Sequence, residues 1–303
     1  MKIIFDFLFF TGFLFTAIVG LLLTWVDRKI SAIIQWRVGP PWYQPFADLF
    51  KLLIKETIIP EGAIKFLFLG APILSVTAAT IISVMLWTMN FAPRTSFVGD
   101  LIVILYLLAL IPIATILGGS ASRNPLSAVG VSREMSLYFG YELPFLLALV
   151  VPILKTNGSI RIGDILLFQQ AHQPFLYSIS GAIATIICLI CFQAKLGYAP
   201  FDIPEAEQEI MAGPYLEYSG VGLALFKLSR AMMLFILPVF IITLFWGGIT
   251  NYWAILKFLL IIILIVLIKN TNPRLRIEQA LRLFWARLSI ISAIGLILAA
   301  FGY

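Results

Sequence analysis

Residues 221–246 read VGLALFKLSRAMMLFILPVFIITLFW, an apolar run that two basic and two hydroxyl side chains interrupt. A helix of this length crosses the hydrocarbon core of a bilayer, which is about 30 Å thick. Directly before it, residues 200–220 read PFDIPEAEQEIMAGPYLEYSG and hold five of the fifteen acidic residues of the chain. Carboxylates this dense beside a bilayer are costly unless they serve ions, protons or the basic face of a partner. We therefore place the functional site in this segment.

The composition predicts a membrane protein over the whole length. Hydrophobic residues make up 61% and charged residues 12% of the 303 residues, with a mean hydropathy of +1.02. A soluble domain carries about 25% charged residues, so residues 1–303 are expected to form a single all-α integral membrane domain. The first apolar run begins at Ile3 without a basic leader or a small-residue cleavage site, which indicates a retained span and not a signal peptide.

Eight apolar runs are each roughly long enough to span a bilayer. They are residues 3–26, 66–89, 101–118, 138–154, 175–193, 221–246, 253–268 and 283–301. The fourth and seventh runs are short, so these helices are expected to be tilted, extended or partly buried in protein. An even number of spans places both termini on the same side of the membrane.

Basic residues set the predicted orientation. Thirteen of the 21 Lys and Arg residues fall in loops on one side, against five on the other side and three inside predicted spans. The basic loops are residues 27–65, 119–137, 194–220 and 269–282. The positive-inside rule places these loops in the cytoplasm and both termini outside. This distribution accounts for the net charge of +6 without any nucleic acid partner.

Residues 45–56 (PFADLFKLLIKE), in the first cytoplasmic loop, predict an amphipathic helix. Its apolar side chains share one helical face: Phe46, Leu49, Phe50 and Leu53. A helix of this kind lies at the membrane interface, and a plain connector is the alternative.

The sequence contains no evident catalytic or metal-binding residue set. Cys188 and Cys191 form a CxxC within an apolar run, which is either a redox pair, a metal half-site or, more commonly, two small residues packed between helices. The single histidine, His172, stands in a polar loop. An iron–sulfur cluster usually needs four thiolates, and there is no glycine-rich phosphate loop or nucleophile elbow. The chain by itself is expected to hold no catalytic residues, metal or cofactor.

Glu142 stands in the motif FGYELPF, at or just inside the predicted fourth span. A carboxylate at that depth is rare and usually faces a cavity or an ion pathway. Arg133 and Glu134 lie on the approach to the same span. The alternative is an interfacial glutamate that reaches the water of the headgroup region.

Lys227 and Arg230 interrupt the sixth span and are three residues apart, so they share a face of the helix. Two buried cations require acids nearby, and the candidates are Glu142, Glu209 and Glu217. The alternative is that both side chains extend to the cytoplasmic interface.

The acidic segment itself predicts a short helix. Asp202 can cap the helix, with Pro204 early in its first turn. Glu205 and Glu209 would then share one face, and Glu207 would point away. Like charges at this spacing repel, so at least one carboxyl pKa is expected to rise toward neutrality, where the group can pass protons. The alternative is a solvated loop, although the interleaved Pro, Ala, Ile and Met residues suit docking against protein.

The segment before the last span, KNTNPRLRIEQALR, carries Arg274 and Arg276. Two interpretations stay open: anchoring at the membrane surface, or binding to an acidic surface of a partner.

These motifs resemble the membrane heel subunit (H-type) of complex I, the NADH:quinone oxidoreductase, over most of the chain. The resemblance is carried by PFDIPEAEQEI and EYSG, by WVDRKISAIIQWRVGPPWYQPFADLFKLLIKETIIPEG after the first span, by the pair Tyr141–Glu142, and by NPRLRIEQALRLFW. Eight spans with both termini outside agree with that family.

Two departures look like a different branch of the superfamily. The sequence AGPYLEYSG, followed by FKLSR where complex I carries a glutamate in the span, is similar to the heel subunit of group 4 energy-converting hydrogenases. These include formate hydrogenlyase, membrane-bound hydrogenase and a membrane-bound sulfur-reducing relative. In the quinone-using members this subunit lines the quinone chamber, whereas in the hydrogenase members the same surface docks the hydrogenase core.

The resemblance implies a role in a larger complex of a prokaryotic cell membrane. A nickel–iron-type large subunit and an iron–sulfur small subunit, which would hold the NiFe centre and the iron–sulfur clusters, would dock on the cytoplasmic loops. Other membrane subunits, including antiporter-like ones, would adjoin the chain in the lipid. The ion path then maps onto Glu142, Asp202, Glu205, Glu207, Glu209, Glu217 and Lys227. Docking and charge balance map onto Arg28, Arg37, Arg133, Arg274 and Arg276.

Two other functions remain as alternatives. One is the quinone-site heel subunit of an NADH or ferredoxin:quinone oxidoreductase. The other is an independent secondary transporter, which would need a midplane substrate site at matched broken helices; the sequence has no such matched pair and no convincing internal repeat.

Overall fold

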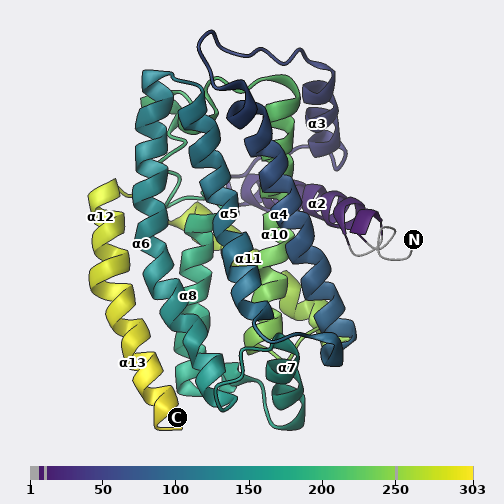
Figure 1. Ribbon diagram of the computed structural model, residues 1–303, viewed down its shortest axis with the longest axis vertical. Helices are drawn as coiled ribbons and strands as arrows, with labels where there is room; N and C mark the ends of the chain where they lie inside the picture. The colour runs from purple at the N-terminus through teal and green to yellow at the C-terminus, as the bar shows by residue number, and fades with distance from the viewer. Residues whose placement is uncertain (1–6, 10–11, 250–251, 303) are drawn as a thin grey trace.

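The computed structural model describes residues 7–9, 12–249 and 252–302, and this part of the chain is a bundle of helices without strands (Figure 1). The longer helices are α2 (Phe13–Ile34), α4 (Lys65–Phe91), α5 (Asp100–Ala121), α6 (Pro125–Lys155), α8 (Ile179–Lys195), α10 (Gly220–Phe245), α11 (Trp253–Thr271) and α13 (Ser289–Ala300). The shorter ones are α3 (Gln44–Ile54), α7 (Ile162–Ala171), α9 (Glu207–Ile210) and α12 (Ile277–Arg282). A π-helical turn, Leu283–Leu288, joins α12 to α13.

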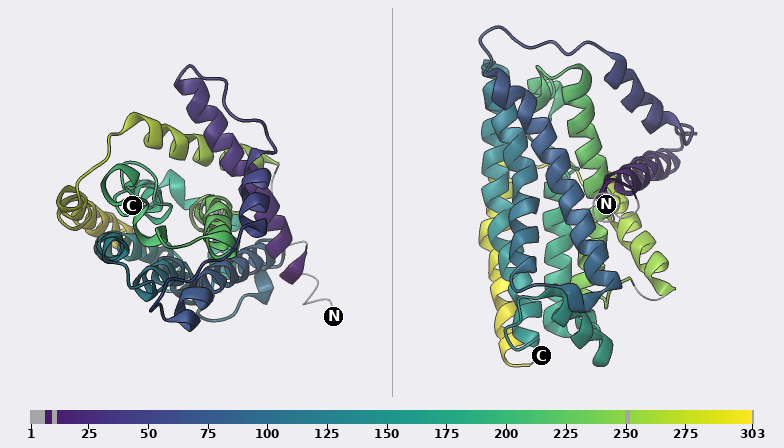
Figure 2. Two further views of the ribbon diagram at one scale, coloured as in Figure 1. Left: turned by 90° about the horizontal axis from the view of Figure 1, so that it is seen from above. Right: turned by 45° about the vertical axis from the view of Figure 1, so that its right-hand side comes forward.

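Six of these helical segments are long and apolar enough to cross a membrane. They are Lys65–Phe91, Asp100–Ala121, Pro125–Lys155, Gly220–Phe245, Trp253–Thr271 and Ile277–Ala300. The other two predicted spans fall on α8, which is apolar but has only 17 residues, and on α2, which is strongly inclined to the near-parallel long helices (Figures 1 and 2). The chain is thus an all-helical membrane protein, and the number of eight spans stays a prediction.

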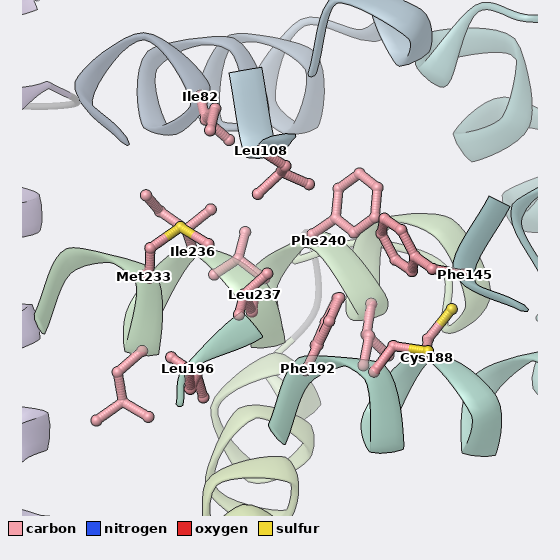
Figure 3. Close-up of a cluster of buried hydrophobic side chains, with 14 of the residues drawn as sticks. Ile82, Leu108, Phe145, Cys188, Phe192, Leu196, Met233, Ile236, Leu237 and Phe240 are labelled. Atoms are coloured by element: carbon pink, nitrogen blue, oxygen red, sulfur yellow. The ribbon is translucent and has the colours of Figure 1, made fainter. Parts of the chain in front are cut away.

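The helix α10 forms the core of the bundle. Every residue from Ala231 to Phe245 is buried, because α10 packs against α2, α4, α8 and α11. Large apolar side chains of α10 interlock with those of four other segments (Figure 3): Met233, Ile236, Leu237 and Phe240 meet Ile82, Leu108, Phe145, Cys188, Phe192 and Leu196. Close packing of this kind, and not exclusion from water, holds helices together in lipid.

The predicted loop 119–137 is largely helical, because α6 begins at Pro125. The side chain of Asn124 accepts a hydrogen bond from the backbone N–H of Leu126 at 2.8 Å, and proline occupies the first helical position, where its missing N–H is harmless. The short fourth run is therefore the end of a 31-residue helix. Polar residues such as Arg133 and Glu134 lie on its first turns and were mistaken for loop residues.

The predicted amphipathic helix is present as α3. It packs against α10 and α2, so Phe46 and Leu49 are partly buried whereas Phe50 and Leu53 are exposed. One half of the predicted apolar face therefore packs against the protein, and the other half is exposed. Its place at the membrane interface stays a prediction.

Gly20 marks a close approach between α2 and α10. A Cβ atom at this position would lie 2.4 Å from the carbonyl oxygen of Ala231, a backbone atom that cannot swing aside. Gly20→Ala is therefore expected to separate the two helices and to lower the free energy of unfolding by about 1–3 kcal/mol. Thermal unfolding of the detergent-purified protein, followed by tryptophan fluorescence, measures the loss.

Gly70→Ala is the matched control for Gly20→Ala. Position 70 also lies in a long helix, α4, but no described atom outside its own helix would lie within 4 Å of the new Cβ. Alanine there is expected to be neutral or to stabilise by up to about 1 kcal/mol, since it is the better helix former. Equal effects of the two substitutions would contradict the close helix crossing at Gly20.

Candidate functional site

The acidic segment 200–219 forms a loop that ion pairs fasten to three different parts of the bundle. Asp202 does not cap a helix, because the first regular element is α9, which begins only at Glu207. Instead its carboxylate accepts hydrogen bonds from the guanidinium of Arg274, with a distance of 2.9 Å from Nε. A fork-like arginine–carboxylate contact is stronger than a local cap, and this contact overrides the predicted helix start.

Arg230 binds the beginning of this loop to α10. Its guanidinium donates to the carboxylate of Glu205 and to the carbonyl oxygens of Leu196 and Gly197, the latter two at 2.7 Å each. Gly197 has a φ of +60°, a left-handed conformation that favours glycine where the backbone turns toward the guanidinium. The predicted partners of Arg230, which did not include Glu205, were wrong. The physical reason is that Glu205 precedes α9 and bends back toward α10.

Glu209 pairs with a third element. Its carboxylate accepts a hydrogen bond from Arg133 of α6 at 2.7 Å. This hydrogen bond and the charge of Arg133 hold the pKa of Glu209 below its ordinary value, so the predicted rise is wrong for this residue. The repulsion that motivated it does not arise, since Glu205 lies outside α9 and each carboxylate has its own guanidinium.

Glu217, a fourth acid of the segment, does not join these contacts. Glu217 accepts a hydrogen bond from the side chain of Asn124 at the start of α6, and it is not among the residues that line the cavity described next. The side chain of Glu207 lies outside the part of the chain that the structure describes.

A cavity of about 900 Å³ lies beneath the loop, between α2, α3, α10 and α11. Of the side chains that the structure describes, nine charged ones line it: Asp27, Arg28, Asp48, Asp202, Glu205, Lys227, Arg230, Lys269 and Arg274. Besides the two pairs above, Arg28 binds Asp48 at 2.9 Å and Lys269 binds Asp27 at 2.7 Å. Although burial alone would raise it, hydrogen bonds from Arg28 and Gln44 hold the pKa of Asp48 below its ordinary value.

Tyr198 connects two cations of the cavity. Its ring lies 4.4 Å from the ammonium of Lys269 and 5.7 Å from the guanidinium of Arg230. Burial, with the nearby charge of Asp27, raises the pKa of the Tyr198 hydroxyl, so it stays protonated at neutral pH. The sequence alone did not indicate four residues of this cavity as site residues: Tyr198, Asp27, Asp48 and Lys269. The three charged residues among them fall in regions that had been assigned to ordinary basic loops.

Glu142 belongs to a second charged centre, between α6 and α8. It pairs with Lys195 at 2.9 Å, and the lysine side chain is only 1% exposed. The ammonium also lies 4.7 Å and 4.5 Å from the ring centres of Tyr141 and Phe145. Lys195 was counted as a loop residue because the apolar run ends at 193, but α8 continues through it.

One face of α6 connects the two centres. Glu134, Tyr138 and Glu142 are four residues apart, so they line one side of the helix. Glu134 interacts electrostatically with Glu205 and Arg230 at the cavity, and Tyr138 with Glu142. Polar groups thus run from the cavity along α6 to the pair of Glu142 and Lys195. Such a series can hold waters and move charge.

The five arginines expected at a docking surface are of two kinds. Arg28, Arg133 and Arg274 pair with acids of the same chain. Arg37 and Arg276 are exposed, and their role in docking stays a prediction. Lys227 is also exposed and faces the cavity from α10.

The chain is similar to known proteins in sequence and in structure. The family profile described as NADH dehydrogenase matches residues 7–300. The chain is 34% identical over 311 residues to the H-type subunit of the NADH-quinone oxidoreductase of Thermomicrobium roseum, covering 91% of this chain and 90% of that protein. It is 33% identical over 294 residues to the corresponding H-type subunit of a Geobacillus species, covering 90% and 86%.

A solved structure is similar over nearly the whole length. It is a chain of the membrane-bound sulfane sulfur reductase, an archaeal respiratory membrane complex, with a TM-score of 0.84 and 27% sequence identity. The similarity covers 95% of this chain and 96% of that one.

Proposed function

The chain belongs to the NADH dehydrogenase family, as the H-type membrane subunit of complex I-like respiratory complexes, and from this premise we propose that it is the anchor and coupling subunit of an energy-converting, hydrogenase-like complex. In this role its cytoplasmic loops dock the peripheral redox arm. Its polar interior links electron transfer in that arm to the translocation of protons or sodium ions.

The observation that carries the proposal is the series of charged and polar groups that leads from the loop along one face of α6. Burying ions inside a protein costs several kcal/mol per ion, and intramembrane charges are expensive and usually functional. Glu205 and Arg230 stand at one end of the series, and Glu142 and Lys195 at the other. Asp202, Glu209 and Lys227 belong to the loop or the cavity. We assign no step to Glu217, which lies apart, and the role of Glu207 rests on the motif alone.

The lining of the cavity favours the hydrogenase-like branch. Binding sites for small organic ligands are lined mostly by apolar side chains with a few polar groups, whereas half of the residues that line this cavity are charged. A quinone would have to displace or tolerate four ion pairs. The similarity to a sulfane sulfur reductase chain over 95% of the length supports the same branch.

The nickel–iron centre and the iron–sulfur clusters are proposed for partner subunits on the cytoplasmic side. Among the described residues, no group of three or more His, Cys, Asp or Glu side chains is arranged to hold a metal ion. Cys188 and Cys191 are free and buried in the core, and the thiol of Cys191 contacts the carbonyl of Tyr141 at 3.6 Å. This arrangement is typical of packing.

Electron transfer in membranes that hold the whole complex tests the proposal. With reduced ferredoxin as donor, we expect evolution of hydrogen or reduction of a sulfur species, together with an ion gradient. The activity is expected to be insensitive to a quinone-site inhibitor. The purified chain alone is expected to show no activity.

A quinone-site function is the second candidate, because the relatives at 33–34% identity are named as H-type subunits of an NADH-quinone oxidoreductase. Inhibition of turnover by the quinone-site inhibitor would select it. Solute uptake by the purified chain in liposomes would instead indicate an independent transporter and would reject both coupling functions.

A further inference from the structure

The charged side chains that line the cavity, as far as the structure describes them, do not balance. Eight of the nine charged side chains form four ion pairs, Arg28–Asp48, Lys269–Asp27, Arg230–Glu205 and Arg274–Asp202. Lys227 is the ninth, and among the described side chains it has no acidic or hydrogen-bonding partner. Among the described side chains that line the cavity, one positive charge is therefore in excess.

The position of Lys227 makes this charge available to a ligand. It lies three residues before Arg230, on the same face of α10, and its side chain is exposed in the cavity. Lysine carries a compact, strongly hydrated charge on a flexible stem. Once a partner covers the loop face, the water is lost and the ammonium needs an anion within reach.

The elements around the cavity carry further exposed cations. Lys51 and Lys55 follow the cavity-lining turn of α3, Arg37 precedes α3, and Arg276 follows Arg274. An acidic protein surface complements this distribution, since opposite charges steer and orient two partners. A neutral quinone ring would bring no charge to pair with Lys227.

We propose that the cavity receives an aspartate or glutamate side chain of the peripheral partner subunit, and that its carboxylate pairs with Lys227. The proposal rests on the proposed function in one respect only: peripheral subunits cover this face of the chain. Lys227 is then a docking residue, and its ion pair forms only when the peripheral subunit is bound.

Carbodiimide cross-linking of the intact complex tests the contact, because this reagent joins an amine to a carboxylate without a spacer. Mass spectrometry is expected to find Lys227 linked to an acidic residue of a peripheral subunit. Lys227→Gln is expected to abolish that link and leave other cross-links of the chain unchanged. Lys257 is the control: it lies on α11, outside the cavity, and its ammonium donates to the carbonyl of Trp246 at 2.7 Å, so it is expected to give no link to that subunit.

Two results would overturn the assignment. One is a link from Lys227 only to an acid of its own chain, Glu207 included. The other is labelling of the Lys227 helix by a photoreactive quinone, with no link to a partner.

Charge reversal provides a second measurement. Lys227→Glu is expected to release the peripheral arm at least about tenfold faster at moderate salt, because truncating or reversing a buried interfacial charge acts mainly on dissociation. Lys227→Arg keeps the charge and is expected to retain the arm. Equal release rates of Lys227→Glu and the parent complex would refute the pairing. Ion pumping is measured separately, so a complex that gives the cross-link but builds no gradient would refute the coupling function and leave this contact standing.

Discussion

Lys195→Met is expected to lower the free energy of unfolding by about 3–5 kcal/mol, the cost of leaving a buried charge without its partner. Lys195 is 1% exposed and pairs with Glu142, which is itself only 16% exposed. The ammonium lies over the rings of Tyr141 and Phe145. These rings cannot pair with the carboxylate of Glu142 once the ammonium is gone. Thermal unfolding of the purified complex measures the loss.

The double variant Lys195→Met/Glu142→Gln distinguishes a lost ion pair from lost packing. Replacing both charges by neutral groups of similar size is often nearly neutral, so the double variant is expected to recover most of the stability. The difference from the sum of the single effects gives the coupling energy of the pair. A double variant as unstable as the sum of the two single variants would show that the ammonium and the carboxylate do not interact.

Arg230→Met is expected to release the loop from α10 and to cost about 3 kcal/mol, because three hydrogen-bond acceptors lose their donor at once. They are the carboxylate of Glu205 and the carbonyl oxygens of Leu196 and Gly197. Hydrogen exchange is expected to become faster across residues 196–205 and to remain unchanged in α4. Exchange measured on the complex by mass spectrometry tests both expectations.

Arg230→Lys is the control for charge. It keeps a cation opposite Glu205 but lacks the fork that reaches the two carbonyls. Its effect is therefore expected to lie between those of the parent and Arg230→Met. If the lysine variant matched the parent in both stability and exchange, the charge alone would hold the loop and the backbone contacts would contribute nothing.

The long apolar elements could be predicted from the sequence because only one structure suits them. The run 221–246 appears as α10 (Gly220–Phe245), and the amphipathic segment 45–56 as α3 (Gln44–Ile54). The length of the apolar run suffices to predict the first helix, and the helical spacing of apolar side chains suffices for the second, so neither prediction needs a tertiary contact. The motifs around Glu142 and Asp202 likewise sufficed to place the chain in its family.

The partners of the charged residues could not be predicted, because they come from distant parts of the chain. Glu209 meets Arg133, which lies 76 residues earlier, and Asp202 meets Arg274, 72 residues later. Asp27 and Lys269 are 242 residues apart. Nothing in a local pattern ranks such pairs, since they depend on how α2, α6 and α11 are arranged in space.

Local rules also misled where a tertiary contact was stronger. Asp202 followed by Pro204 has the signature of a helix start, but the contact with Arg274 takes the carboxylate away from the backbone. Lys195 was assigned to a loop because hydropathy falls at residue 194, whereas the pairing with Glu142 lets the helix continue with the lysine buried.

The ion gradient built per electron transferred tests the coupling function most directly. It is measured in vesicles that hold the whole complex, with Glu142→Gln and Glu209→Gln examined beside the parent. Both variants are expected to keep their metal centres and electron transfer, while the gradient per electron falls at least about tenfold. At Glu142 a neutral amide cannot relay charge. At Glu209 the amide gives up the ion pair with Arg133 that holds the loop against α6. Full pumping by both variants would contradict the account, since the carboxylates would then play no part in moving ions.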